Sequence, residues 1–138
     1  MKIIVDSNRV IAALIKQSTT REILFNEYFE FFAPETIKEE VEKYREEIIE
    51  KADSSSGAFG ILLSLVFEHI SILPMSNYQE LIGNMRLLTK DAKDVPYFAA
   101  CSFLKAEGIW THDPHFTEQK KFRIFTNIQM LQMSGKDN

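Results

Sequence analysis

The chain has 138 residues, and 45% of them are hydrophobic, which is typical of a globular domain and too high for a disordered chain. Sixteen basic and 20 acidic side chains give a net charge of −4, which excludes a general electrostatic attraction to nucleic-acid phosphates; such binding would need local basic patches or bound cations. The single cysteine, Cys101, excludes a disulfide scaffold and a cysteine-built zinc site.

One domain is expected over residues 1–138, because this length lies within the usual range for a single domain. The longest apolar runs are far shorter than a membrane span, and no secretory leader is recognisable in the first residues. The composition therefore predicts a cytoplasmic protein of a reducing compartment, with no membrane partner.

Short apolar runs, two of them closed by proline, alternate with segments of helical periodicity. The runs expected to form strands are residues 2–6, 29–33, 70–73, 109–111 and 124–126. The first run is continuously apolar rather than alternating, which is typical of a strand buried on both faces. We therefore expect it to lie inside the sheet.

Helical patterns fill the segments between these runs. The expected helices are residues 10–16, 19–26, 35–51, 58–69, a segment beginning at 77, 94–106 and 128–133. Thr19 with Glu22, and Asn77 with Glu80, have the spacing of a capping box, which predicts a helix start at each pair. Gly108 is expected to end the preceding helix.

Strands separated by helices pair in parallel through right-handed crossovers. We therefore predict an α/β protein, a three-layer α/β/α sandwich with a mostly parallel central sheet. In such sheets, functional groups gather beyond the carboxyl ends of the strands, near the point where the strand order reverses.

Three aspartates fall where that rule places a site. Asp6 ends the first strand, Asp94 begins the helix that leads to the fourth strand, and Asp113 follows that strand. A carboxylate at the tip of a buried strand is desolvated unless something pairs with it, so Asp6 is hard to explain as a surface residue. Asp94 and Asp113 each also suit a helix cap.

A fourth acid comes from the charged helix predicted at 35–51. The residues that define its inward stripe are Ile37, Val41, Tyr44 and Ile48. At about 100° per residue, Glu40 lies only about 60° from Ile37, on the side of this stripe. Glu47 is its close competitor, whereas the other glutamates of the helix point away.

Several carboxylates held together repel one another unless they bind protons or a hard cation. An all-oxygen site suits Mg²⁺ or Mn²⁺ rather than zinc. Such ions bind phosphodiesters and activate water, and they reverse the local field that a negative protein would otherwise present to a phosphate.

Four segments carry a recognisable pattern: IIVDSN at residues 3–8, APE at 33–35 followed by EEV at 39–41, KDAKDVPY at 90–97, and IWTHD at 109–113. In this order, and over nearly the whole chain, they resemble the PIN-domain ribonucleases, including the VapC-like toxins of toxin–antitoxin pairs. The resemblance implies an endoribonuclease that uses Mg²⁺ or Mn²⁺ and leaves a 5′-phosphate. RNA would be its substrate and, for a toxin, an antitoxin protein its partner.

The resemblance places the family's catalytic and metal-binding acids on Asp6, Glu40, Asp94 and Asp113. Its supporting polar groups fall on Ser7, Asn8 and Thr111. Asp6 would be the central ligand, with Asp94 and Asp113 completing the shell of the first ion. Glu40 would bind a second ion or orient the attacking water.

Some residues depart from the family pattern. Arg9 stands where an aliphatic residue is usual; we expect it to bind substrate phosphate, although an antitoxin carboxylate or a nearby acid would also suit it. Asp91 competes with Asp94, which we favour because it adjoins the buried helix. His112 and His115 lack a third soft ligand, so we expect them at the surface or facing substrate. The candidate RNA-backbone contacts are Arg9, Lys38, Arg45, Lys90, Lys93, Lys120, Lys121 and Arg123.

Two other functions compete with the nuclease. One is an interaction module that keeps a PIN-like fold with weak or lost metal binding. The other is a haloacid-dehalogenase-like phosphohydrolase, against which Asn8 argues because that chemistry needs a second aspartate there. We also expect a homodimer, and the phenylalanines that could line its interface or fill the core are Phe25, Phe29, Phe31, Phe32, Phe59 and Phe67.

Overall fold

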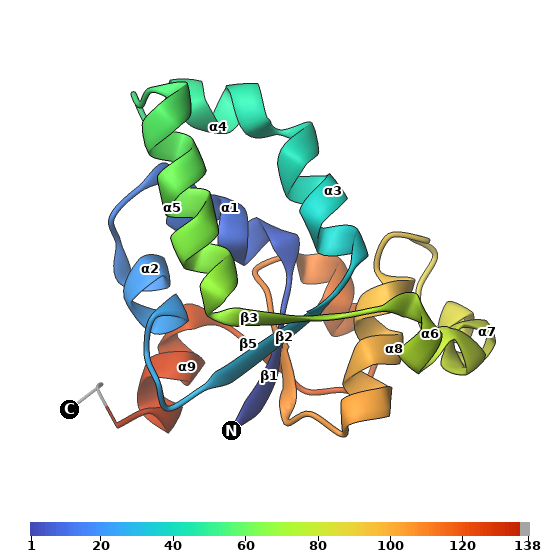
Figure 1. Cartoon of the computed structure of the whole chain (residues 1–138). Coiled ribbons are helices and arrows are strands. Elements are labelled where there is room, and N and C mark those ends of the chain that lie inside the picture. Colours follow the sequence, from blue (N-terminus) through green and yellow to red (C-terminus); the bar gives the residue numbers. More distant parts are fainter. Residues whose placement is uncertain (136–138) are drawn as a thin grey trace.

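The computed structural model describes residues 1–135, so the last three residues of the predicted domain lie outside it. Within residues 1–135, five strands form one sheet in the order β3-β2-β1-β4-β5, and every neighbouring pair is parallel. The strands are β1 (Lys2–Val5), β2 (Glu30–Pro34), β3 (Ile70–Leu73), β4 (Gly108–Trp110) and β5 (Ile124–Phe125). With helices on both faces of this sheet, the predicted three-layer α/β/α fold is confirmed (Figure 1).

One face of the sheet is covered by the larger helical layer. Its helices are α1 (Ser7–Ile15), α2 (Thr19–Leu24), α3 (Thr36–Lys43), α4 (Arg45–Lys51), α5 (Ser56–Glu68) and α9 (Asn127–Met133). Ile3 and Val5 of β1 point into this layer and pack among its apolar side chains. In Figure 1, α3 and α5 rise together from the sheet, and α4 joins their far ends.

The other face is covered by α8 and by a run of short helices. These elements are α6 (Met75–Tyr78), η1 (Gln79–Leu81), α7 (Ile82–Met85), η2 (Arg86–Leu88) and α8 (Val95–Leu104). Ile4 of β1 packs into this second core with Phe98 and Ile109. Because both faces of β1 are covered, its three apolar residues from Ile3 to Val5 are fully buried, as the continuous apolar run predicted.

The helix predicted at 35–51 is broken at Tyr44, whose backbone (φ −103°, ψ 14°) leaves the helical region between α3 and α4. Ile37, Val41 and Ile48 are buried as the stripe predicted, but Tyr44 is 40% exposed. The expectation that Tyr44 faces inward was therefore wrong, because the break changes the direction of its side chain.

Both predicted capping boxes are absent from the described chain. Helix α2 begins after Ser18 with no side-chain cap, and Asn77 lies inside α6 rather than before it. Gly108 does not end α8, because that helix already stops at Lys105, which adopts a left-handed conformation (φ 53°). Gly108 instead opens β4, where a Cβ would lie 2.5 Å from the carbonyl oxygen of Arg123.

The phenylalanines considered for a dimer interface all contribute to packing, and none is exposed: Phe25, Phe29, Phe31, Phe32, Phe59 and Phe67. These six phenylalanines therefore fill the two cores, and the homodimer stays a prediction. None of the helices in residues 1–135 combines the length and apolar character needed to cross a membrane.

Candidate active site

The strand order reverses at β1, since β2 and β3 extend the sheet on one side and β4 and β5 on the other. A crevice beyond the carboxyl ends of β1 and β4 is therefore the expected place for a site. Val5 of β1 is in register with Trp110 of β4, and the backbone N–H of Asp6 donates to the Trp110 carbonyl at 3.1 Å. This pairing brings Asp6 and Thr111, the residues that follow the two strands, side by side.

Asp6 is only 6% exposed. Its Oδ1 accepts a hydrogen bond from the Ser7 backbone N–H (2.8 Å), and its Oδ2 accepts one from the Thr111 hydroxyl (2.7 Å). Burial, together with the negative charges of Glu40 and Asp113, raises the pKa of Asp6 to about 6 despite these two bonds. Asp6 is therefore a fixed, desolvated carboxyl group within the field of two other acids.

Thr111 organises the groups around Asp6. While its hydroxyl donates to Asp6, the same oxygen accepts hydrogen bonds from Asn8 Nδ2 (3.1 Å) and from the Asp113 backbone N–H (3.0 Å). Asn8 is in α1 and Asp113 is in the loop after β4, so this one buried side chain joins both sides of the crevice. The predicted supporting residues Asn8 and Thr111 thus contact each other.

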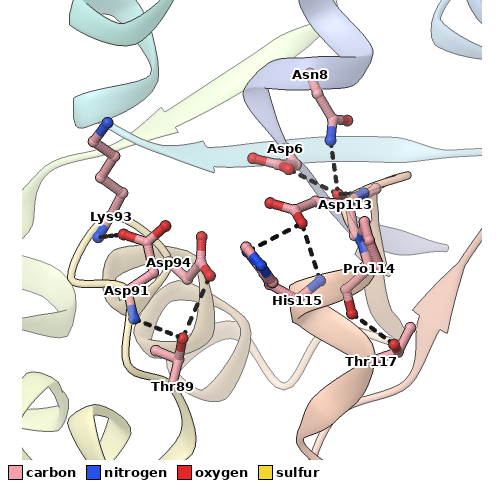
Figure 2. Close-up of polar contacts among 11 residues, drawn as sticks. Asp6, Asn8, Thr89, Asp91, Lys93, Asp94, Asp113, Pro114, His115 and Thr117 are labelled. Atoms are coloured by element: carbon pink, nitrogen blue, oxygen red, sulfur yellow. Dashed lines mark hydrogen bonds and ion pairs between the residues drawn. The ribbon is translucent and has the colours of Figure 1, made fainter.

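Asp113 precedes the short 3-10 helix η3 (Pro114–Glu118) and caps it. Its Oδ1 accepts from the His115 backbone N–H at 3.0 Å and lies 3.5 Å from His115 Nδ1. The capping role considered from the sequence is therefore observed. Figure 2 shows that the carboxyl group of Asp113 nevertheless lies beside Asp6, so capping does not remove it from the crevice.

Glu40 looks into the domain, as the helical wheel predicted. Its Oε2 accepts from the Ser7 hydroxyl and its Oε1 from the Tyr97 hydroxyl, each at 3.0 Å. Burial raises the pKa of Glu40, while Tyr97, Ser7 and the charge of Lys93 oppose that rise. The competitor Glu47 is instead on the exposed side of α4.

The sequence motifs assign no role to Tyr97, although it closes the segment KDAKDVPY. Its position on the buried helix is a signal that could have found it, because a buried tyrosine hydroxyl usually has a polar partner. That partner is Glu40, and the side chain is 1% exposed.

Asp94 occupies the position before α8, but within the described chain its side chain makes no capping hydrogen bond. It is 5% exposed and accepts one long hydrogen bond, 3.4 Å, from the Thr89 hydroxyl. Burial, together with the charges of Asp91, Asp113 and Asp6, raises its pKa to about 7. Figure 2 shows Asp94 facing the crevice across from Asp113. Asp91 instead accepts from the Lys93 backbone N–H in a local turn.

Arg9 lies in a polar network behind the carboxyl groups. Its Nε donates to Asn8 Oδ1 (3.0 Å), and its Nη1 donates to Thr20 Oγ1 (3.2 Å) and weakly to Asn127 Oδ1 (3.5 Å). Burial lowers the pKa of Arg9, and the charge of Asp6 partly restores it. The guanidinium of Arg9 already has three protein partners. Its contact with substrate phosphate stays a prediction.

The same network also holds His112, one of the two histidines near the site. Asn127 accepts from the indole N–H of Trp110 (2.9 Å), and its backbone N–H donates to His112 Nε2 (3.1 Å). Burial and the charge of Arg9 lower the pKa of His112. His112 and His115 are both exposed, as expected.

The donor set suits a hard divalent cation, although in residues 1–135 no three His, Cys, Asp or Glu side chains lie together as a formed metal site. All candidate ligands are carboxylates, which is the chemistry of Mg²⁺ or Mn²⁺. Within the described residues, Asp6 and Asp94 make no ion pair with a basic side chain. Their pKa values are raised by burial and by neighbouring acids, so a cation would relieve the repulsion.

A family model described as "PIN domain" matches residues 4–126, and the chain therefore belongs to the PIN-domain family. PIN domains are generally nucleases, and the PIN-domain nucleases bind RNA and typically use Mg²⁺ or Mn²⁺. The comparison with curated proteins gives no match.

Proposed function

We propose that this protein is an endoribonuclease that uses Mg²⁺ or Mn²⁺ to hydrolyse RNA phosphodiesters at the crevice beyond β1 and β4. The observation that supports this most is that two buried carboxyl groups, Asp6 and Asp94, face one crevice, where burial and neighbouring acids raise their pKa values to about 6 and about 7. Buried carboxyl groups that repel one another destabilise the folded protein unless a bound cation neutralises their charge.

The roles we propose follow from how each side chain is held. Asp6 is fixed by Ser7 and Thr111, so its carboxylate would be the central ligand, with Asp94 and Asp113 on either side. A bound ion would lower the pKa of a water molecule and offset the negative charge on the phosphate.

Glu40 is held at both carboxylate oxygens by the hydroxyl groups of Ser7 and Tyr97. This double anchoring fixes the direction of the carboxylate, and preorganised charge is what catalysis requires. We propose that Glu40 orients the attacking water or holds a second cation at the α3 side of the crevice.

Cleavage of a mixed RNA pool with Mn²⁺ tests the proposal. Asp6→Asn and Asp94→Ala should each lower the rate by about a hundredfold or more, and the cut ends should carry 5′-phosphates. Glu47→Gln is the matched control, since Glu47 is exposed and pairs with Lys51 at 3.0 Å. Full activity of Asp6→Asn, or undiminished cleavage in EDTA, would contradict the proposal.

A PIN-like interaction module is the second candidate, and one observation favours it: the acids in residues 1–135 are not already arranged as a metal site. Calorimetric titration with Mn²⁺ separates the two candidates, because an interaction module should bind no Mn²⁺ at millimolar concentration. If the protein is a toxin, an antitoxin should cover the carboxylates with a basic side chain, and co-expression should then suppress cleavage.

A further inference from the structure

A cavity of about 360 Å³ lies beside Glu40, between α3 and the loop that leads into α8. Its lining includes Ser7, Glu40, Lys43, Tyr44, Lys93 and Pro96. Ser7 and Glu40 belong to the candidate active site, so the cavity opens directly from it. A volume of this size falls within the range, roughly 300–1,000 Å³, of sites that bind small organic groups.

Tyr44 gives this cavity an accessible aromatic wall. The break between α3 and α4 exposes 40% of the residue, although the helical stripe predicts burial. Tyr44 and Glu40 both line this cavity, so the ring lies near the carboxylate. An exposed tyrosine ring beside a catalytic carboxylate is a platform on which an unpaired base can stack.

Two lysines supply positive charge at the same cavity. Lys43 places its Nζ 5.7 Å from the centroid of the Tyr44 ring. Lys93 extends from the opposite loop (Figure 2) and acts on Glu40 through its charge. Within residues 1–135, neither lysine forms an ion pair with an acidic side chain, so both remain available to phosphate groups.

We propose that this cleft binds one nucleotide of single-stranded RNA next to the cleaved phosphodiester, a proposal that rests on the nuclease function above. The base stacks on Tyr44 with Pro96 opposite, and the flanking phosphates bind Lys43 and Lys93. Stacking on a side chain needs a base that is not paired, which excludes an intact duplex from the cleft. The two lysines offset the charges of Glu39 and Glu40, which line the same cleft.

Fluorescence anisotropy with a fluorescein-labelled, mixed-sequence single-stranded RNA, measured on the full chain in EDTA, tests the cleft without cleavage. Tyr44→Ala should weaken binding about tenfold, whereas Tyr44→Phe should bind like wild type because the ring is kept. Lys43→Ala and Lys93→Ala should each lower the slope of log K against log salt by about 0.7.

Tyr28→Ala and Lys2→Ala are the matched controls, since both residues are exposed at the amino end of the sheet. They should leave binding unchanged. Three results would each contradict the proposed nucleotide-binding role of the cleft. They are equal losses of binding in Tyr44→Ala and Tyr28→Ala, no measurable binding by wild type, and equally tight binding of the same sequence as a duplex.

Parallel cleavage assays with Mn²⁺ separate failure of the cleft from failure of the nuclease function. If wild type cleaves RNA while Tyr44→Ala and Lys93→Ala bind like wild type, the cleft is wrong and the nuclease stands. If both variants lose binding but wild type cleaves no RNA, the cleft stands and the nuclease assignment is overturned.

Discussion

The hydroxyl group of Thr111 serves three neighbours at once, because it donates to Asp6 and accepts from Asn8 and from the Asp113 backbone. A buried side chain with this many partners cannot change rotamer without leaving polar groups unsatisfied. A residue 105 positions away in the sequence therefore helps to fix the position of Asp6.

Replacing Thr111 by valine keeps the shape of the side chain and removes its hydroxyl. We expect the free energy of unfolding to fall by about 1–3 kcal/mol, because Asp6, Asn8 and Asp113 each lose a hydrogen-bond partner in a buried place. Urea denaturation followed by the fluorescence of Trp110, the single tryptophan, measures this loss. Thr111→Ser keeps the hydroxyl and should be less destabilising, so equal losses in the two variants would contradict the assigned hydrogen bonds.

Asp6 and Asp94 have pKa values of about 6 and about 7, above their ordinary value of 3.8. Between about pH 4 and pH 7 the folded, metal-free protein therefore holds protons that the unfolded chain has released. The free energy of unfolding should fall as the pH rises through this window and change little from these two groups at higher pH.

Urea denaturation in EDTA at several pH values tests this sign. The double variant Asp6→Asn, Asp94→Asn should lose less stability than wild type between about pH 4 and pH 7, because amides do not titrate. The same decline in wild type and in the variant would show that other groups cause it.

At the scale of elements, the approach of β4 to β5 depends on Gly108. The ideal Cβ of an alanine there would lie 2.5 Å from the Arg123 carbonyl oxygen and 2.6 Å from the Phe125 ring. Since Thr111 and the loop to Asp113 directly follow β4, a shift of β4 would also displace the candidate site.

Gly108→Ala should lower the free energy of unfolding by about 1–3 kcal/mol or more, because backbone and ring must move to make room. Gly60→Ala in α5 is the matched control: nothing lies within 4 Å of its added Cβ, and alanine favours a helix interior by about 0.5–1 kcal/mol. Thermal or urea denaturation of both variants compares them, and a Gly108→Ala protein as stable as wild type would refute the close approach.

The break between α3 and α4 changes the exposure of Tyr44. A continuous helix would keep Tyr44 on the stripe with Ile37, Val41 and Ile48; the break leaves it half exposed beside Glu40. Helical periodicity describes a regular backbone only, so it fails at the residue where regularity ends.

At the scale of the whole molecule, the reversal of strand order at β1 explains why distant motifs meet. Parallel strands bring their carboxyl ends to one edge of the sheet, so the residues after β1 and β4 become neighbours. Helices α3 and α8 then bring Glu40 and Asp94 from the two helical layers to that same edge. Four carboxyl groups thus face one crevice, where the charges of Glu40 and Asp113 raise the pKa of Asp6 and those of Asp113 and Asp6 raise the pKa of Asp94.

Much of this arrangement follows from the sequence alone. The β-branched run before Asp6, the alternation of strands and helices, and the inward direction of Glu40 depend on local geometry, because strand and helix periods are properties of a short stretch of backbone. These features predicted the α/β/α fold and the position of the acids at the carboxyl edge of the sheet.

Only the tertiary structure decided which side chains hold the acids and which face solvent. Thr111 on Asp6, Tyr97 on Glu40, and Arg9 between Thr20 and Asn127 are contacts across elements far apart in the chain. They depend on how the layers pack, and a buried polar group takes whichever partner packing brings within reach. No local pattern contains that information, because the partners become neighbours only when the sheet and its two helical layers assemble.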